Sequence, residues 1–249
     1  MHAITVNGLS VQYNKQLALD NVYFQVPTGS MTGIIGPNGA GKSTFMKAIL
    51  GLVPILSGNI LLYDKPVHSE RKMIGYVPQR SEVDWDFPIH ALDVVLMGRY
   101  QYFKKIRPIS KKDKELALHH LSSIGMEDFA YRQISQLSGG QQQRVFLARA
   151  LAQDTPIYFM DEPFAGVDAA TEKVMIDLMK KWKQEGKTVI VVHHDLQTVK
   201  EYFDHVLLLN IKTIGCGKTD EIFHVNNIQK AYGGKLTVFP DISMAGNDQ

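Results

Sequence analysis

The sequence predicts an α/β fold: a core sheet around a glycine-rich loop, with an antiparallel β-subdomain at the N-terminus and an inserted helical subdomain. The first third of the chain alternates apolar and polar residues in the manner of strands, and residues 81–149 change to helical spacing. From residue 157 onward, apolar strands alternate with helical patterns, which is typical of a parallel sheet. We therefore expect the strand before the glycine-rich loop and these later strands to share one sheet.

The individual elements follow from the spacing of apolar residues. We expect strands at residues 4–9, 19–26, 32–35, 59–63, 74–77, 157–160, 188–192 and 205–209. Helices are expected at residues 43–50, after Ser110, at 169–184 and at 196–202. The helix after Ser110 has four apolar residues on one side: Leu116, Leu118, Leu121 and Ile124. Beyond Tyr232 the chain turns polar and contains glycine, which predicts a frayed tail.

Composition and charge narrow the classes of protein that the chain can belong to. With 249 residues, of which 45% are hydrophobic, it can bury a full core as one large domain or two closely packed ones. Its longest apolar runs fall far short of the roughly 18 to 20 residues that cross a bilayer, so we expect no membrane-spanning segment. A formal net charge of +2 is too small to indicate a nucleic-acid partner. The single cysteine, Cys216, excludes an intrachain disulfide and suits a reducing cytosol.

A glycine-rich loop follows the expected strand at 32–35 and opens the expected helix. It matches the pattern G-x-x-x-x-G-K-[ST], with the residues Gly36, Pro37, Asn38, Gly39, Ala40, Gly41, Lys42, Ser43 and Thr44. Glycines let backbone N–H groups approach the β- and γ-phosphates, and the helix turns the positive end of its dipole toward them. Lys42 would neutralise phosphate charge, and Ser43 would hold Mg²⁺. The loop therefore predicts binding of a nucleoside triphosphate.

Two carboxylates, Asp161 and Glu162, close the apolar run at 157–160. Sheets of this class bind ligands at the carboxyl ends of their strands, so both acids are expected at the ligand edge. Asp161 would orient the Mg²⁺ shell, and Glu162 would polarise the attacking water beside the γ-phosphate. The alternative is an acid pair that caps the next helix. The upstream phosphate loop favours the catalytic interpretation.

Residues 137–144 have the sequence Leu-Ser-Gly-Gly-Gln-Gln-Gln-Arg. Ser138 can cap a new helix, and Gly139 and Gly140 leave its first N–H groups open to an anion. With Gln141, these residues resemble the signature of the ATP-binding-cassette family. The resemblance implies a P-loop (RecA-like) core and a helix start that contacts the γ-phosphate held by the loop of a second cassette, so that ATP joins two copies head to tail. A bare helix start is the alternative.

Further positions match motifs of the same family in the right order. Tyr13 resembles the aromatic residue on which adenine stacks, although its alternation with Val11 also suits a strand residue that faces the core. Gln79 resembles the glutamine that contacts Mg²⁺ and water and joins the sheet to the helical subdomain. Both residues are therefore expected at the nucleotide.

Two more motifs carry competing interpretations. Asp168 ends a stretch that resembles the loop crossing to the partner cassette, and it could instead only cap the next helix. His194 resembles the switch histidine that hydrogen-bonds the γ-phosphate and orients the water with Glu162. His193 competes for that role, but only His194 directly precedes the Asp-Leu pair at 195–196.

One segment indicates a branch of the family. Residues 83–89 and 93–100 resemble the branch that powers bacterial manganese, zinc and related metal importers, and the paired His193-His194 agrees with it. Trp85 and Phe87, which lie between acids, fit an anchor that faces a partner, and packing within the helical subdomain is the alternative.

The resemblance implies a peripheral ATPase at the cytoplasmic face of the membrane, with ATP and Mg²⁺ as its cofactors. Its expected partners are a second copy of itself, integral membrane permease subunits and, indirectly, an extracellular metal-binding protein, with no nucleic acid. The expected cargo is manganese, with zinc or iron next. The alternatives are the motor of an exporter, an ATPase linked to nucleic acid or ribosomes, and a nucleotide sensor without turnover. The ATPase domain is expected at 1–232, with a helical subdomain at 81–150 and a C-terminal tail at 233–249.

Overall fold

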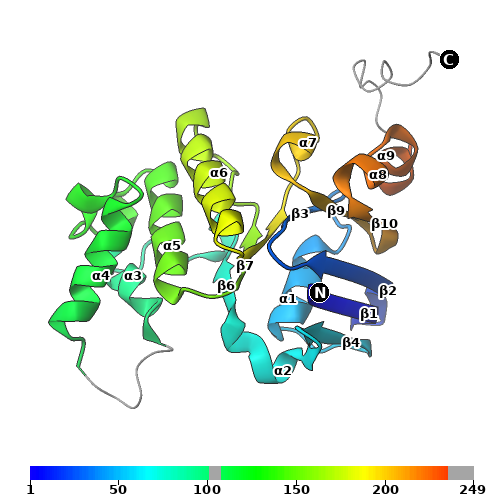
Figure 1. Ribbon diagram of the computed structural model, residues 1–249, viewed down its shortest axis with the longest axis horizontal. Helices are drawn as coiled ribbons and strands as arrows, with labels where there is room; N and C mark the ends of the chain where they lie inside the picture. Colours follow the sequence, from blue (N-terminus) through cyan, green and yellow to red (C-terminus); the bar gives the residue numbers. More distant parts are fainter. Residues whose placement is uncertain (101–107, 235–249) are drawn as a thin grey trace. The chain divides into compact units, whose positions relative to one another are not determined.

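The computed structural model describes residues 1–100 and 108–234 (Figure 1). The chain divides into two compact units, residues 1–71 with 190–249 and residues 72–189. Most of the predicted tail, from residue 235 on, lies outside the described residues. Among the residues that the structure describes, no helix combines the length and the apolar character needed to cross a bilayer.

The first unit begins with an antiparallel sheet. Its strands are β1 (His2–Tyr13), β2 (Gln16–Pro27), β4 (Ser57–Leu62) and β5 (Lys65–Pro66), in the order β2-β1-β4-β5. Helix α1 (Lys42–Leu50) packs on β2, where the rings of Phe45 and Phe24 meet edge to face at 5.3 Å. Buried apolar residues alternate along the second half of β2, because one face of the sheet carries the core. Short helix α2 (Val67–Glu70) follows β5.

The first unit also holds the strands around the phosphate loop. β3 (Met31–Ile35) is buried at all five residues and lies between β8 (Thr188–Val192) and β9 (His205–Asn210). β3 runs parallel to β9, and β10 (Lys212–Lys218) pairs antiparallel with β9. The described part of the unit also contains the helices α7 (Val199–Tyr202), α8 (Thr219–Ile222) and α9 (Val225–Tyr232). The predicted sheet shared by the strand before the loop and later strands is confirmed for β8 and β9.

In the part of the second unit that the structure describes, a pair of strands is combined with several helices. β6 (Ile74–Val77) and β7 (Ile157–Asp161) pair in parallel. Helices α3 (Ala91–Met97), α4 (Lys111–Ser122) and α5 (Gly139–Gln153) pack on one another, and α5 also contacts β6 and α6 (Ala169–Gln184) (Figure 1). Tyr158 of β7 stacks on the buried Trp182 of α6, with ring centroids 4.1 Å apart. α5 therefore lies at the centre of the contacts among the described helices of this unit.

The predicted α/β fold is confirmed, with the antiparallel N-terminal sheet, the parallel strands and the helical region in their expected places. Several local expectations were wrong. α7 begins at Val199 and not at residue 196, because the Asp195 side chain accepts the Gln197 N–H at 2.9 Å and forms a turn first. β10, α8 and α9 were not anticipated. In α4 the fully buried apolar residues are Ala117 and Leu121, and Leu116 and Leu118 are only half-buried.

Candidate functional site

The phosphate loop runs from the end of β3 to the start of α1 and lies tightly against its neighbours. A Cβ at Gly36 would collide with the carbonyl oxygen of Leu209 in β9. A Cβ at Gly41 would lie 2.6 Å from the carbonyl oxygen of Ala18. The Ala40 carbonyl accepts a hydrogen bond from the Ile211 N–H at 2.9 Å. Only a glycine-rich sequence can follow this path, so the close approach of backbone that a phosphate requires is built into the loop.

Helix α1 begins at Gly41, whose φ of +91° belongs to the left-handed region. No side chain among the described residues caps this helix start, so its first N–H groups face the loop, as in an anion site. Lys42 is 7% exposed, and its ammonium donates to the carbonyl oxygens of Gly36 at 2.8 Å and Pro37 at 3.0 Å. The loop therefore holds a buried cation beside an open helix start, which is the chemistry that a triphosphate needs.

The two predicted acids follow one another at the end of β7 in the second unit. Asp161 is 1% exposed. Glu162 has a φ of +48°, a left-handed backbone that costs a non-glycine residue about 1 to 3 kcal/mol. Its Oε2 accepts a hydrogen bond from Nε2 of Gln79 at 2.8 Å, so the structure brings these two predicted residues together across 83 positions of sequence. The strained backbone and the long-range bond mark Glu162 as a positioned acid.

Each residue that the sequence assigns to Mg²⁺ carries an oxygen atom of the kind that this ion binds. Ser43, Gln79 and Asp161 offer a hydroxyl, an amide and a carboxylate oxygen, and hard oxygen ligands are those that Mg²⁺ takes. Asp161 is buried, and a cation would balance its charge in that environment. Burial first, and then the charges of Asp161 and Glu82, raise the pKa of Tyr76 on the neighbouring strand.

The signature helix α5 begins at Ser138, which forms a complete capping box. The Ser138 Oγ accepts from the Gln141 N–H at 3.3 Å, and the Gln141 Oε1 accepts from the Ser138 N–H at 2.9 Å. A Cβ at Gly140 would lie 3.2 Å from Thr171 Oγ1 and 3.8 Å from Asp168 Oδ2. The structure therefore places Gly140 beside Asp168, two residues that the sequence assigned to the same contact with a partner cassette.

Asp168 caps helix α6, as one of its two interpretations expected. Its Oδ1 accepts from the Thr171 N–H at 2.8 Å, and its Oδ2 from the Thr171 hydroxyl at 3.2 Å. The hydrogen bond from the Thr171 backbone is the main cause that lowers the pKa of Asp168, so the carboxylate stays ionised. Its contact with a second copy stays a prediction.

The two adjacent histidines differ in their surroundings. His193 is 2% exposed, its Nε2 lies 2.8 Å from the Thr198 hydroxyl, and its ring meets Phe203 at 5.3 Å. Burial lowers the pKa of His193 to about 4, so it is neutral at pH 7. His194 is exposed. Of the two histidines, His194 is therefore available to a ligand, and His193 packs beneath it. The supporting Thr198 was not anticipated, because no local pattern distinguishes it.

The exposure of the side chains distinguishes between the alternative interpretations of Tyr13, Trp85 and Phe87. Tyr13 is 42% exposed whereas Val11 is fully buried, so the alternative that Tyr13 faces the core is wrong. Trp85 packs on Phe146 of α5 with ring centroids 5.2 Å apart, as the packing alternative expected. Phe87 is 55% exposed and remains open to a partner.

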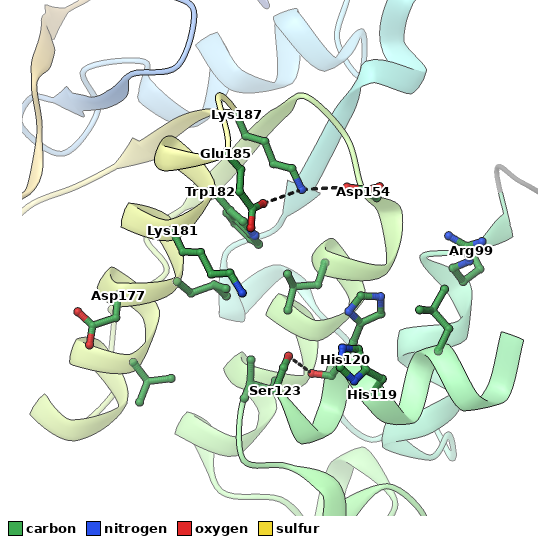
Figure 2. Close-up of a pocket in the computed structure, with 15 residues that line it drawn as sticks. Arg99, His119, His120, Ser123, Asp154, Asp177, Lys181, Trp182, Glu185 and Lys187 are labelled. Atoms are coloured by element: carbon green, nitrogen blue, oxygen red, sulfur yellow. Dashed lines mark hydrogen bonds and ion pairs between the residues drawn. The ribbon is translucent and has the colours of Figure 1, made fainter. Parts of the chain in front are cut away.

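A cavity of about 590 Å³ lies in the second unit between α4, α5 and α6 (Figure 2). Lys187 donates to Asp154 at 2.8 Å and lies 3.5 Å from Glu185. Burial lowers the pKa of His120 to about 4. None of the residues that line this cavity belongs to the predicted nucleotide site, and Lys187, Asp154 and Glu185 form ion pairs among themselves.

Each unit thus brings together part of the predicted site. In the first unit are the phosphate loop, Tyr13 and His194, and in the second are Gln79, the acids Asp161 and Glu162, and the signature helix.

Comparison with known proteins identifies the relatives of this chain. A family model described as ABC transporter matches residues 19–165. The chain is 56% identical to the manganese transport system ATP-binding protein MntB of Bacillus subtilis, over 98% of both chains. It is 52% identical to the zinc transport system ATP-binding protein TroB of Treponema pallidum, over 96% of this chain and 91% of that protein. A solved ATP-binding cassette, dimeric and bound to ADP and Pi after hydrolysis, matches with a TM-score of 0.76 and 28% identity, over 86% of this chain and 98% of that one.

Proposed function

The chain belongs to the ABC transporter family, and we propose that it is the ATP-binding and ATP-hydrolysing subunit of an importer of a divalent metal. The hydrogen bond from Gln79 to Glu162 carries the hydrolytic part of this proposal. It fixes one oxygen of the acid that follows a buried strand, which supports a role of that acid as general base.

Binding of ATP rests on the first unit. The N–H groups at the start of α1 and the buried ammonium of Lys42 surround the β- and γ-phosphates. The exposed ring of Tyr13 provides a flat surface for adenine. Because the loop already has its shape, little ordering cost opposes binding.

Hydrolysis rests on three side chains. Glu162 accepts a proton from the attacking water, and Gln79 fixes the direction of that carboxylate. His194 is exposed and donates to the γ-phosphate, whereas the neighbouring His193 is buried and neutral. Mg²⁺ held by Ser43, Gln79 and Asp161 would neutralise charge on the phosphates.

A second copy of the chain completes the site. Ser138, Gly139, Gly140, Gln141 and Asp168 are proposed to contact the ATP held by the other copy. The dimeric cassette among the solved structures supports this assembly.

The cargo and the membrane partner follow from the relatives. Their names refer to manganese and zinc transport systems, and the chain is similar to both over nearly its whole length. We propose manganese first and zinc next, carried through separate permease subunits at whose cytoplasmic face this subunit docks. An extracellular metal-binding protein would deliver the cargo.

Phosphate release from ATP and Mg²⁺ tests the hydrolytic proposal. Glu162→Gln should lower the rate roughly 100-fold or more, because a general base contributes about that much, while ATP affinity stays within a few-fold. Glu115→Gln, at the exposed salt bridge with Lys111, is the matched control and should leave the rate unchanged. Equal rates for Glu162→Gln and the unmodified protein would contradict the proposal.

Metal uptake into vesicles that contain the permease and this subunit tests the transport proposal. ATP-dependent accumulation of Mn²⁺ or Zn²⁺ that disappears with Glu162→Gln is expected. Accumulation of neither metal with the unmodified subunit would rule out this cargo.

A further inference from the structure

We infer that Arg80 is a positioning residue that connects the Gln79 loop to the first turns of α5, so that Gln79 and the Ser138 helix start keep one fixed relation. This inference rests on the proposed ATPase function and adds a residue that none of the nucleotide-site motifs includes.

The guanidinium of Arg80 binds the second turn of α5. Its Nε and Nη2 both donate to Oε1 of Gln142, at 3.3 Å and 3.2 Å. Gln142 is 4% exposed, and its Nε2 donates to the carbonyl oxygen of Ile134 at 3.0 Å. Because both ends of the Gln142 amide are occupied, its orientation is fixed, and it presents one acceptor to the fork of Arg80.

Arg80 also lies close to Gly139, the first residue of α5. A Cβ at Gly139 would lie 2.9 Å from Cζ of Arg80, and its nearest atoms all belong to that guanidinium. Gly139 therefore leaves room for the arginine to lie over the helix start. The signature glycine has a local packing role in addition to its proposed contact with a nucleotide.

A second contact joins the same loop to α5 one turn further along. The Trp85 Nε1–H donates to the Arg80 carbonyl oxygen at 2.7 Å, and Cζ of Arg80 lies 6.0 Å from the Trp85 ring centroid. Trp85 in turn packs on Phe146. Gln142 and Phe146 are four residues apart, so the loop meets one face of α5 at two successive turns.

The electrostatics favour a positioning role over helix stabilisation. A cation near a helix N-terminus meets the positive end of the dipole and is disfavoured there. Arg80 holds this place through directed hydrogen bonds to Gln142. Gln79 directly precedes Arg80 and hydrogen-bonds Glu162. A shift of α5 that moves Arg80 would therefore also move Gln79 and change the position of the Glu162 carboxylate.

Steady-state ATP hydrolysis by variants of the full chain tests the inference. Arg80→Ala should lower kcat about tenfold and leave KM for ATP and the melting temperature nearly unchanged, whereas Arg80→Lys should recover part of kcat. Arg80→Ala combined with Gln142→Met should be no slower than either single variant. Arg132→Ala is the matched control, because Arg132 is also exposed and lies over an aromatic ring, that of Phe129 at 4.8 Å.

Unchanged kcat in Arg80→Ala would overturn the inference while the proposed function stands. Losses that multiply in the double variant, or a melting temperature that falls with kcat, would overturn it too. Failure of the unmodified protein to hydrolyse ATP would instead count against the proposed function.

A fluorescence measurement tests the role of Arg80 without ATP hydrolysis, so it also applies if the unmodified protein does not hydrolyse ATP. The chain has two tryptophans, so Trp182→Phe leaves Trp85 as the only fluorophore of its kind. Arg80→Ala in that background should raise acrylamide quenching of Trp85 about twofold, because the guanidinium no longer covers the ring. Equal quenching would show that Arg80 does not hold this loop.

Discussion

Helices α1 and α5 both begin where a phosphate group is expected, yet they begin in different ways. α1 starts at Gly41, in a left-handed conformation with no capping side chain among the described residues, and the buried Lys42 lies beside it. α5 is capped by the exposed Ser138, and the side chains of Ser138 and Gln141 each accept the backbone N–H of the other residue. The first helix start is left open to an anion by a glycine that adopts the left-handed region without strain, and the second is capped by its own side chains. We infer that α1 is the permanent phosphate site and that α5 is a surface that engages ATP only when a second copy brings it.

The largest expected effect concerns the shape of the loop before α1. Gly41→Ala should destabilise the protein by roughly 2 to 5 kcal/mol, from the left-handed backbone and the collision with Ala18 and Leu19. Gly39→Ala, also at positive φ but with open space around it, should cost only about 1 to 2 kcal/mol. Thermal unfolding of both variants measures the difference. Equal losses would mean that the loop is not tightly enclosed.

The next effect concerns the cation beside α1. Lys42→Ala should weaken ATP binding roughly 10- to 100-fold, because charge-assisted hydrogen bonds to phosphate are lost. Lys47→Ala, at the other end of the same helix, should keep the affinity. A nucleotide titration compares them. Retained affinity in Lys42→Ala would remove the distinction between the two helix starts.

Lowering the pH should destabilise the first unit through protonation of His193, and it should leave the capping box of α5 unaffected. Burial, followed by the charge of His194 and opposed by Asp195, lowers the pKa of His193 to about 4, so the unfolded chain binds the proton more readily. Stability from neutral His193 is therefore present above pH 6.5 and is lost as pH falls toward 4, by about 2 kcal/mol between pH 7 and 5. Urea unfolding at both pH values should show that His193→Gln removes this part of the slope. The capping box of α5 contains no ionisable group and should not contribute.

The smallest expected effect distinguishes the capping role of Ser138 from its role in ATP-dependent association of two copies. Ser138→Ala should cost about 1 kcal/mol of stability and should also weaken ATP-dependent association. Ser110→Ala removes the equivalent capping box of α4 and should cost a similar amount of stability without changing association. Sedimentation with ATP distinguishes them. Identical association in both variants would reduce Ser138 to a cap.

Local patterns allowed much of this molecule to be predicted. The bounds of α6 at Ala169–Gln184 follow directly from a capping Asp168 and helical spacing. β10 was missed because Gly215 and Gly217 interrupt it and its inner residues are only half-buried, so it carries no alternating pattern. Within the site, the phosphate loop has a local signature. The Arg80–Gln142 contact and the left-handed Glu162 have none, since they depend on packing between residues far apart in the chain.

The mass of Glu162→Gln in solution, measured by light scattering with and without ATP, tests most directly whether α5 completes a site on another copy. With ATP and Mg²⁺ the variant should have the mass of two chains, and without nucleotide the mass of one. Adding Ser138→Arg should return it to one chain although ATP still binds. A single-chain mass at saturating ATP, with binding verified, would contradict a site shared between two copies.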